Sequence, residues 1–381
     1  MRSFDVVIVG AGPAGATAAR AAAEAGARVA LVDGSHPREK PCGGGLTRRA
    51  LQLTPPAVQS QTAVEIRGAR FEVDVDAVAV PLQAGGTRLR VMSRRTFDQA
   101  LVDAAARAGA TLVGQRATAV ARHRDGWTVH LRDGVVTGSW LLGADGPSGI
   151  VRRQVFRPFA RRQLSIAAGA FVEGATAREV AIAFLDEPRG YLWSFPRPDH
   201  LAVGACAAAD VATPAALHAV TDRWLDQQAG ARGCRRRRYA WPIPSLGPAD
   251  FDGEQPSGDR WLLLGDAAGL VDPITREGIY FAIRSGLEAA AALRGPDPAR
   301  RYAEAIRHGI HSELRRAARF EQAVFRPRFT RLLLRGLVRS ERIREVMRDL
   351  IAGEQSYRGL RRRLLATCEI GLMWSLLHSR D

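Results

Sequence analysis

The feature that most constrains the fold is a glycine-rich turn near the N-terminus, between an apolar strand-like run at residues 4–9 and an alanine-rich helical stretch. The turn reads GAGPAG over residues 10–15. Gly10 permits a tight turn, Gly12 lets a pyrophosphate approach the backbone, and Gly15 lets the helix pack closely on the strand. Ala14 belongs to the same turn, where the helix N-terminus faces the phosphates. The pattern predicts a Rossmann-type dinucleotide-binding unit.

An acidic residue follows this turn at the distance that such a unit requires. A second predicted strand, residues 28–32, ends at Asp33. A carboxylate there can accept hydrogen bonds from both ribose hydroxyls of an adenosine, and it would repel a 2′-phosphate. The site therefore suits FAD or NAD rather than NADP.

Three later segments resemble the fingerprints of the flavin monooxygenase and reductase superfamily. They are GADG at residues 143–146, GDAAG at 265–269 and the RxxFDxxL pattern that begins at Arg94. The resemblance implies FAD as the cofactor, with Asp266 bonded to its ribityl chain and Arg94 near its diphosphate or ribityl region. A helix that begins at Gly278 and Ile279 would direct its positive end at the flavin. An exposed arginine at a helix start is the alternative interpretation of Arg94.

The sequence PCGGG at residues 41–45 is similar to a turn of the geranylgeranyl reductase family, in which a loop passes beside the isoalloxazine. Glycines suit a backbone that lies against a flat ring. The resemblance implies that Cys42, Gly43 and Gly44 contact the cofactor and that Cys42 faces the substrate. A small buried thiol without chemistry is the alternative.

A second match to this family is YLWSFP at residues 191–196. Alternation places Tyr191, Trp193 and Phe195 on one face of a strand. These three residues and Cys42 are our candidate catalytic residues, with the aromatic side chains roofing an apolar cavity over the flavin. An aromatic core strand would give the same spacing.

The third match is GDAAGLVDPITREG at residues 265–278. Family members usually have glycine where this chain has Arg276, close to the expected flavin edge. Its side chain could point away, or it could reach a substrate phosphate or the flavin.

We therefore expect an α/β fold with a Rossmann-type FAD-binding domain, an interleaved antiparallel-sheet substrate domain and a helical C-terminal region. Strand-like alternation and a helical pattern near residues 215–228 support this plan. The predicted pieces are residues 1–62, 93–152 and 257–295 for the FAD-binding domain, 63–92 and 153–256 for the substrate domain, and 296–381 for the C-terminal region.

The C-terminal region combines apolar and basic residues. Residues 329–338 read FTRLLLRGLV, and a further apolar patch includes Leu364, Leu365, Ile370, Leu372, Met373 and Trp374. Such helices could cover a substrate tunnel, or they could rest peripherally on an anionic membrane. The formal charge of +16 is nearly all arginine, since Lys40 is the one lysine, and nucleotide composition could account for it. Because no nucleic-acid-binding motif accompanies the charge, we expect no nucleic acid partner.

Four cysteines, Cys42, Cys206, Cys234 and Cys368, lie far apart without a CxxC pair, so we expect neither a zinc site nor a disulfide framework. No metal is predicted. The N-terminal residues show no export signal, and no apolar run reaches membrane-spanning length. We expect a cytoplasmic protein, with possible peripheral contact at the inner face of the membrane.

The family resemblance implies an FAD-dependent oxidoreductase that reduces carbon–carbon double bonds of a hydrophobic, prenyl-type substrate. Hydride would come from the reduced flavin, and a proton from Cys42, its backbone or an ordered water. Two alternatives stay open: a monooxygenase (hydroxylase) of a biosynthetic pathway, and a non-redox isoprenoid cyclase. Halogenases of this superfamily use an active-site lysine. Halogenation is disfavoured here because Lys40, the one lysine, stands directly before the PCGGG turn and does not match that position. No second glycine fingerprint appears, so the electron donor is either transiently bound NAD(P)H or reduced ferredoxin, which would make an electron-donor protein a partner.

Overall fold

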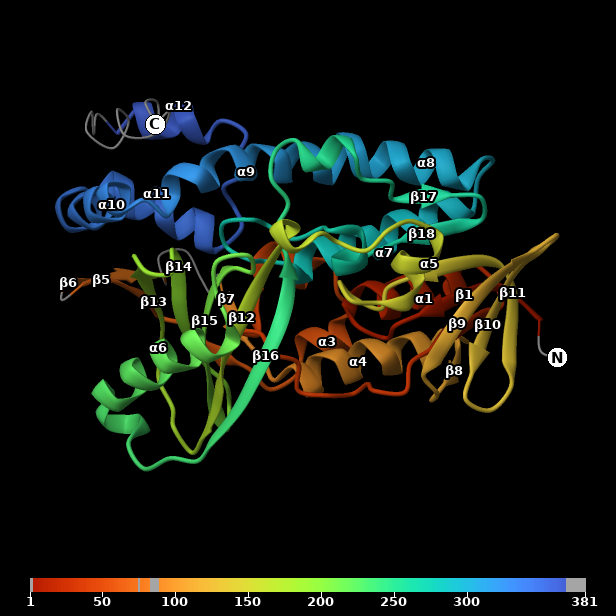
Figure 1. The fold of residues 1–381 in the computed structure, drawn as a ribbon, viewed down its shortest axis with the longest axis horizontal. Coiled ribbons are helices and arrows are strands. Elements are labelled where there is room, and N and C mark those ends of the chain that lie inside the picture. The colour runs from red at the N-terminus through yellow and green to blue at the C-terminus, as the bar shows by residue number, and fades with distance from the viewer. Residues whose placement is uncertain (1–2, 75, 83–88, 368–381) are drawn as a thin grey trace.

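The computed structural model describes residues 3–74, 76–82 and 89–367. In Figure 1 a mainly parallel sheet with helices on both sides occupies one end of the molecule, and a large antiparallel sheet occupies the other. The C-terminal helices run along the top of both parts. The mixed α/β architecture with its Rossmann-type unit and helical C-terminal region confirms the predicted fold class.

The first sheet has the strand order β17-β18-β11-β1-β2-β8, and a β9–β10 hairpin extends from β11. Strands β18, β11, β1, β2 and β8 pair in parallel, as expected when helices connect buried apolar strands. Their bounds are β1 Ser3–Val9, β2 Val29–Val32, β8 Thr111–Val113, β9 Ala117–His123, β10 Gly126–Leu131, β11 Val135–Gly143, β17 Ser257–Gly258 and β18 Trp261–Leu263.

Helices α1 and α7 pack against each other beside this sheet. The close approach requires a glycine in α7, because a Cβ at Gly286 would lie 2.5 Å from the carbonyl oxygen of Ala14. The helices around this sheet are α1 Pro13–Glu24, α2 Arg48–Gln52, α3 Pro56–Gln59, α4 Arg94–Arg107, α5 Ile150–Val155 and α7 Ile279–Leu293.

The second sheet has the order β16-β12-β15-β14-β13-β5-β6, and every pair is antiparallel except β13–β5. Helix α6, Pro214–Gln227, covers one face. The strands are β5 Gly68–Val73, β6 Asp76–Pro81, β12 Leu164–Glu173, β13 Glu179–Leu185, β14 Gly190–Pro196, β15 His200–Ala208 and β16 Arg236–Pro244.

A small third sheet links the two large ones. Strand β7, Leu89–Val91, pairs with β3, Gly45–Thr47, and with β4, Val64–Glu65. Residues 63–92 thus contribute strands to both the small sheet and the large antiparallel sheet. The domain boundaries remain a prediction.

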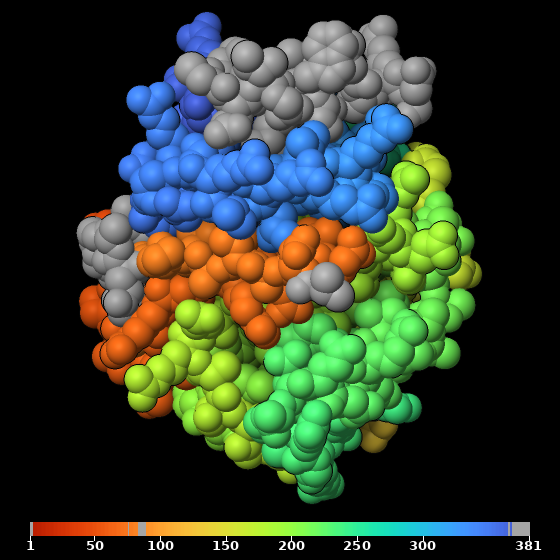
Figure 2. All heavy atoms as spheres, turned by 90° about the vertical axis from the view of Figure 1, so that its left-hand side faces the viewer, coloured from red at the N-terminus to blue at the C-terminus, as the bar shows by residue number. Residues whose placement is uncertain are grey.

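The C-terminal helices lie over the second face of the antiparallel sheet. Figure 2 shows them, in blue, directly against the orange residues of β5 and β6. The apolar side of α10 faces inward, with Phe329, Leu333 and Leu337 buried. Covering the sheet is therefore one role of these helices. Their bounds are α8 Pro298–Ala305, a π-helical segment Ile306–His311, α9 Ser312–Val324, α10 Pro327–Arg339, α11 Glu341–Ile351 and α12 Leu360–Leu365.

Candidate active site

One large cavity of about 380 Å³ joins the glycine-rich unit to the antiparallel sheet and the C-terminal helices. Its polar end includes Lys40, Cys42, Arg94 and Asp266. The opposite part is almost entirely apolar. Its apolar lining includes Phe71, Val180, Ile182, Phe184, Tyr191, Trp193, Phe195, Ile243, Phe320, Val324, Phe325, Phe329, Leu333, Ile343, Val346, Met347, Leu350, Ile351, Leu360 and Leu364.

The glycine turn has the shape of a phosphate site. Gly10 has φ +103°, and a Cβ at Gly15 would lie 1.9 Å from the carbonyl oxygen of Gly10. In contrast, outside its chain neighbours the nearest atom to a Cβ at Gly12 would be 3.9 Å away, on His36. The protein alone does not need a glycine at position 12, so the space there is free for a bound phosphate. Ala14 is buried in the first turn of α1.

Asp33 is held by protein donors. One carboxylate oxygen accepts from the Ala11 backbone NH at 2.8 Å and lies 2.7 Å from Nδ1 of His36, and the other accepts from the NH and hydroxyl of Ser35. Burial opposes ionisation, but the hydrogen bonds from His36 and these donors lower the pKa of Asp33 below its usual range. Ionised Asp33 thus links the glycine-rich turn to the end of β2 through its hydrogen bond from Ala11. Its contact with ribose hydroxyls stays a prediction.

His36 lies between two carboxylates. Its Nε2 is 3.4 Å from Asp98, on the side opposite Asp33. Burial by itself lowers the pKa of His36, but hydrogen bonds to Asp33 and Asp98 raise it above the ordinary value. Sequence reasoning missed this residue, which places a titratable ring beside Gly12.

Arg94 is buried rather than exposed, so the alternative interpretation of this residue is wrong. Its guanidinium pairs with Asp98 one helical turn later, at 2.9–3.0 Å. It also lines the cavity. Contact with FAD stays a prediction for this side chain.

Asp266, at the end of β18, forms an ion pair with Lys40 at 3.0 Å. A Cβ at Gly278 would lie 3.2 Å from the Asp266 carboxylate, so this acid and the start of α7 are adjacent. Ile279 is the first residue of α7 and, with Gly278, lines the cavity. The structure thus places Asp266, Gly278 and Ile279, which we assigned to the ribityl and flavin region, beside one another.

The PCGGG loop lies against an aromatic ring of the protein. A Cβ at Gly43 or Gly45 would lie 3.0 or 2.9 Å from the ring of Phe195. Gly44 has φ +77°, and its Cβ would lie 2.4 Å from the carbonyl oxygen of Met92. Phe195 and the backbone of Met92 therefore already require these three glycines, whereas we attributed them to the flavin ring alone.

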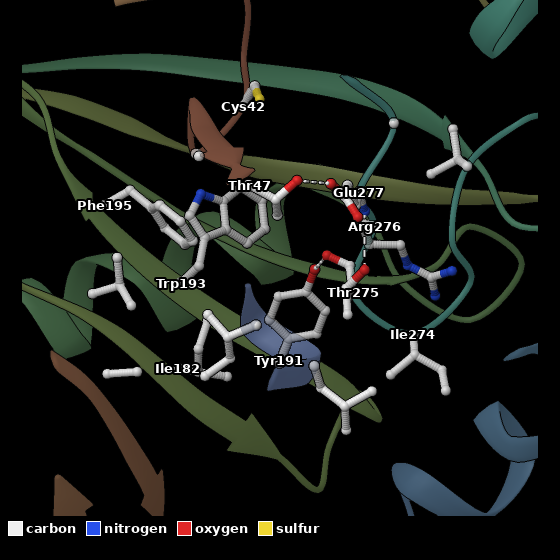
Figure 3. A pocket seen from close by; sticks show the side chains of 18 of the residues that line it. Cys42, Thr47, Ile182, Tyr191, Trp193, Phe195, Ile274, Thr275, Arg276 and Glu277 are labelled. Carbon is white, nitrogen blue, oxygen red and sulfur yellow. Dashed lines mark hydrogen bonds between the residues drawn. The ribbon is translucent and has the colours of Figure 1, made fainter. Parts of the chain in front are cut away.

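Cys42 lies at the junction of the polar and apolar parts of the cavity. Its sulfur accepts from the Gly44 backbone NH at 3.2 Å and interacts with Arg94. Its carbonyl oxygen accepts from the buried guanidinium of Arg197, which also pairs with Glu39. In Figure 3 the thiol lies above Trp193 at the edge of the cavity. The loop position of Cys42 is therefore fixed by contacts from α4 and from the end of β14.

The aromatic residues of β14 face the cavity as the alternation predicted. Tyr191, Trp193 and Phe195 line it, while Leu192 packs on the other face among residues covered by α6. The Tyr191 hydroxyl donates to the carbonyl oxygen of Thr275 at 3.0 Å (Figure 3). The three rings form one wall between the PCGGG loop and the C-terminal helices.

Arg276 has φ +57°, a conformation that favours glycine. Its side chain donates to the Ser245 hydroxyl and lies 3.8 Å from the carboxylate of Glu321. Neither partner lines the cavity, although Arg276 itself does. The guanidinium thus joins the turn before α7 to β16 and α9, and no contact in the structure directs it toward a substrate.

Sequence reasoning also missed Trp241 and Arg197. Trp241, in β16, lines the cavity with the guanidinium of Arg38 4.7 Å from its ring centre and the Lys40 ammonium 6.0 Å away. Burial lowers the pKa of Arg197 to about 10. The one sequence signal for Arg197 was its place directly after the aromatic strand.

Over the described ranges, no group of three or more histidine, cysteine, aspartate or glutamate residues could hold a metal ion. Within the same ranges no helix is both long and apolar enough to cross a membrane. Cys42, Cys206 and Cys234 are free thiols, and Cys368 lies outside the described residues, as do Ile370, Leu372, Met373 and Trp374.

The residues present fit FAD. The open space at Gly12 accommodates a pyrophosphate, Asp33 stands at the end of β2, and Asp266 stands beside the N-terminus of α7. When bound, FAD would supply two-electron redox chemistry at this end of the cavity.

Comparison with known proteins agrees with this geometry. Residues 3–172 match the family model of an FAD binding domain. The chain is 32% identical over 315 residues to a menaquinone reductase from Mycolicibacterium smegmatis, covering 76% of each chain. It is 31% identical over 311 residues to a digeranylgeranylglycerophospholipid reductase from Methanothrix thermoacetophila, covering 76% of this chain and 77% of that one.

Solved structures have the same fold. A geranylgeranyl bacteriochlorophyll reductase-like protein from Thermoplasma acidophilum has a TM-score of 0.77 at 23% identity, covering 96% of this chain and all of that one. A flavin-dependent brominase has a TM-score of 0.71 at 18% identity, covering 97% and 100%. The fold is therefore common to several flavin chemistries, whereas the sequence relatives are named reductases. The chain belongs to the geranylgeranyl reductase family of FAD-dependent oxidoreductases.

Proposed function

We propose that this protein reduces carbon–carbon double bonds in a long hydrophobic, prenyl-type substrate. The observation that carries the proposal is the single cavity that runs from Asp266 and Cys42, beneath the aromatic wall of β14, to the apolar side of the C-terminal helices. A cavity of this composition suits a hydrocarbon chain, because apolar walls recover the free energy of removing such a chain from water.

Polar groups are concentrated at the cofactor end of the cavity. Lys40, Arg94 and Asp266 lie there, whereas the residues of β13, α10 and α11 that line the cavity are all apolar. An isolated alkene offers no charge for an enzyme to polarise, so catalysis would depend on holding the double bond in a dry, fixed position. Tyr191, Trp193 and Phe195 would provide that position.

The relatives point to the same substrate class. One is named a menaquinone reductase and another a digeranylgeranylglycerophospholipid reductase, and the second name specifies an isoprenoid chain. A reductase of isoprenoid lipids also accounts for the extension of the cavity under α10 and α11, since a short substrate would not use it.

The reaction needs one hydride donor and one proton donor. One alkene carbon receives a hydride from the reduced cofactor and the other receives a proton, so that the π bond breaks and two C–H bonds form. Cys42 is the proposed proton donor, because its thiol lies at the junction of the two parts of the cavity. Water would return the proton to the sulfur. NAD(P)H or reduced ferredoxin would return two electrons.

Hydroxylation is the second candidate, because a hydroxylase is among the solved structures that have this fold. A brominase and an anhydrotetracycline hydroxylase share the fold, with TM-scores of 0.71 and 0.64. Their identities of 18% and 21% indicate the fold alone. The identity above 30% to named reductases favours reduction.

Anaerobic turnover tests the proposal. The FAD-loaded protein, reduced with dithionite, would be incubated with a geranylgeranyl phospholipid and with menaquinone. Product masses would be measured after extraction and reoxidation of the menaquinol ring to the quinone, so that only alkene reduction adds mass. We expect an increase of about two mass units per reduced bond, and a large loss of rate in Cys42→Ala with FAD content unchanged. Unchanged masses without oxygen, together with addition of one oxygen atom in air, would instead establish a hydroxylase.

A further inference from the structure

A second pocket lies on another side of α9 and is strongly basic. Helix α8, the π-helical segment and α9 follow one another without a break at the top of Figure 1. Arg307, His311, Arg315 and Arg319 recur every four residues, which places them along one side of this helix. The pocket is lined by Phe251, Asp252, Arg307, His308, His311, Ser312, Arg315, Arg316 and Arg319.

The positive charge of this pocket is not neutralised by the protein. Arg315 pairs with Asp252 at 2.6 Å. Arg307, Arg316 and Arg319 make no hydrogen bond or ion pair with any residue that the structure describes. Four arginines therefore surround one carboxylate. Like charges at this helical spacing repel each other and destabilise a helix, so an anion in the pocket would relieve a repulsion that the sequence maintains.

His311 provides an independent indication of a ligand. Its side chain is 2% exposed, and neither ring nitrogen has a hydrogen-bond partner in the described structure. The ring lies edge-on to Phe251, at 5.3 Å between centres. Burial, followed by the charges of Arg315 and Arg307, lowers the pKa of His311 to about 4. The neutral ring then keeps one N–H donor, and a buried donor without an acceptor is unfavourable.

This pocket is separate from the candidate active site. None of its lining residues lines the large cavity, to which α9 contributes Phe320 and Val324. The π-helical segment that carries His311 is a local departure from α-helical geometry, and such segments are frequent at functional sites.

We propose that this pocket binds a phosphate-bearing anion. Arginine guanidinium groups bind phosphate oxygens through paired N–H donors. Arg307 and Arg315 carry their charge close enough to His311 to affect its pKa, and Arg316 and Arg319 line the same pocket. The inference does not depend on the reaction proposed for the large cavity.

Calorimetric titration of the FAD-loaded full-length protein with inorganic phosphate, at constant ionic strength in chloride, tests the proposal. We expect saturable binding of one phosphate per chain. Arg316→Gln/Arg319→Gln should weaken it at least tenfold. The matched control Arg328→Gln/Arg335→Gln removes the same charge from exposed positions of α10 and should bind as the unmodified protein does. Absence of saturable binding, or equal weakening in both double variants, would overturn the proposal.

Two further measurements locate the site and distinguish the sources of phosphate. Ring signals of His311, assigned by comparison with His311→Gln, should shift at saturating phosphate, and unchanged signals would contradict the pocket as the site. ADP should compete with inorganic phosphate if the ligand is a soluble phosphate compound, and short-chain phosphatidic acid should compete if it is a lipid headgroup. If anionic vesicles bind through Arg316 and Arg319 but free phosphate does not, the arginines form a membrane contact and the pocket proposal fails.

Discussion

Replacement of Trp193 by alanine distinguishes a substrate-contacting ring from a structural one. Trp193 is 6% exposed, and its indole crosses Gly204 so closely that a Cβ there would lie 2.6 Å from the ring. Removing a fully buried tryptophan costs about 3–5 kcal/mol. Because this ring already borders a cavity, we expect a cost of about 3 kcal/mol, at the lower end of that range.

Leu192→Ala is the matched control. Leu192 precedes Trp193 on the same strand, is fully buried, and packs on the opposite face under α6. Truncation of a buried leucine costs about 2–5 kcal/mol, so both variants should lose similar stability. Only Trp193→Ala enlarges the cavity beside the cofactor end.

The assay pairs chemical unfolding with product analysis per folded, FAD-containing molecule. Trp193→Ala should change which double bonds are reduced, or how many, and Leu192→Ala should leave the product pattern unchanged. The reasoning would be refuted if Trp193→Ala lost stability but gave the unmodified product distribution, since the ring would then be packing alone.

Further predictions concern the cofactor, pH and membranes. Gly12→Val should abolish FAD retention in a cofactor assay after gel filtration, since its side chain would occupy the phosphate space, whereas Gly114→Val, in open surroundings, should retain FAD. Burial raises the pKa of Asp145 to about 6. The contribution of protonated Asp145 to the free energy of unfolding is therefore full below about pH 4 and is lost as the pH rises through 6. In Asp145→Asn the free energy of unfolding, measured in urea, should depend less on pH across this window, and an unchanged pH dependence would contradict the assignment. Arg328→Gln/Arg335→Gln should reduce co-sedimentation with anionic vesicles, and salt should do the same; equal binding to neutral vesicles would argue against electrostatic contact.

Local sequence patterns predicted the elements of the site well. The strand, glycine turn and helix at residues 4–25 correspond to β1 and α1, and alternation placed Tyr191, Trp193 and Phe195 on one face. Each pattern reflects backbone geometry over a few residues, which neighbouring side chains determine.

Contacts between distant segments were not predictable in the same way. His36 lies beside Asp98, which is 62 positions away in the sequence. The need for glycine at position 43 comes from the ring of Phe195, which contacts the loop only once β14 is in place. Strand β7 pairs with β3 and β4 in a small separate sheet rather than joining the large sheet, a choice of partner that alternation does not encode. The basic pocket could not be predicted either, because Phe251 and Asp252 are distant in sequence from the α9 residues with which they line it.

The most direct test of alkene reduction is a single anaerobic turnover in D₂O. The protein, holding one equivalent of dithionite-reduced FAD, would be mixed with a geranylgeranyl phospholipid while flavin absorbance and product mass are followed. Because the flavin N–H and the thiol both exchange with solvent, each turnover should reoxidise one flavin and add four mass units in D₂O against two in water. Flavin that stays reduced until oxygen is admitted, with a product that then gains one oxygen atom, would contradict the account.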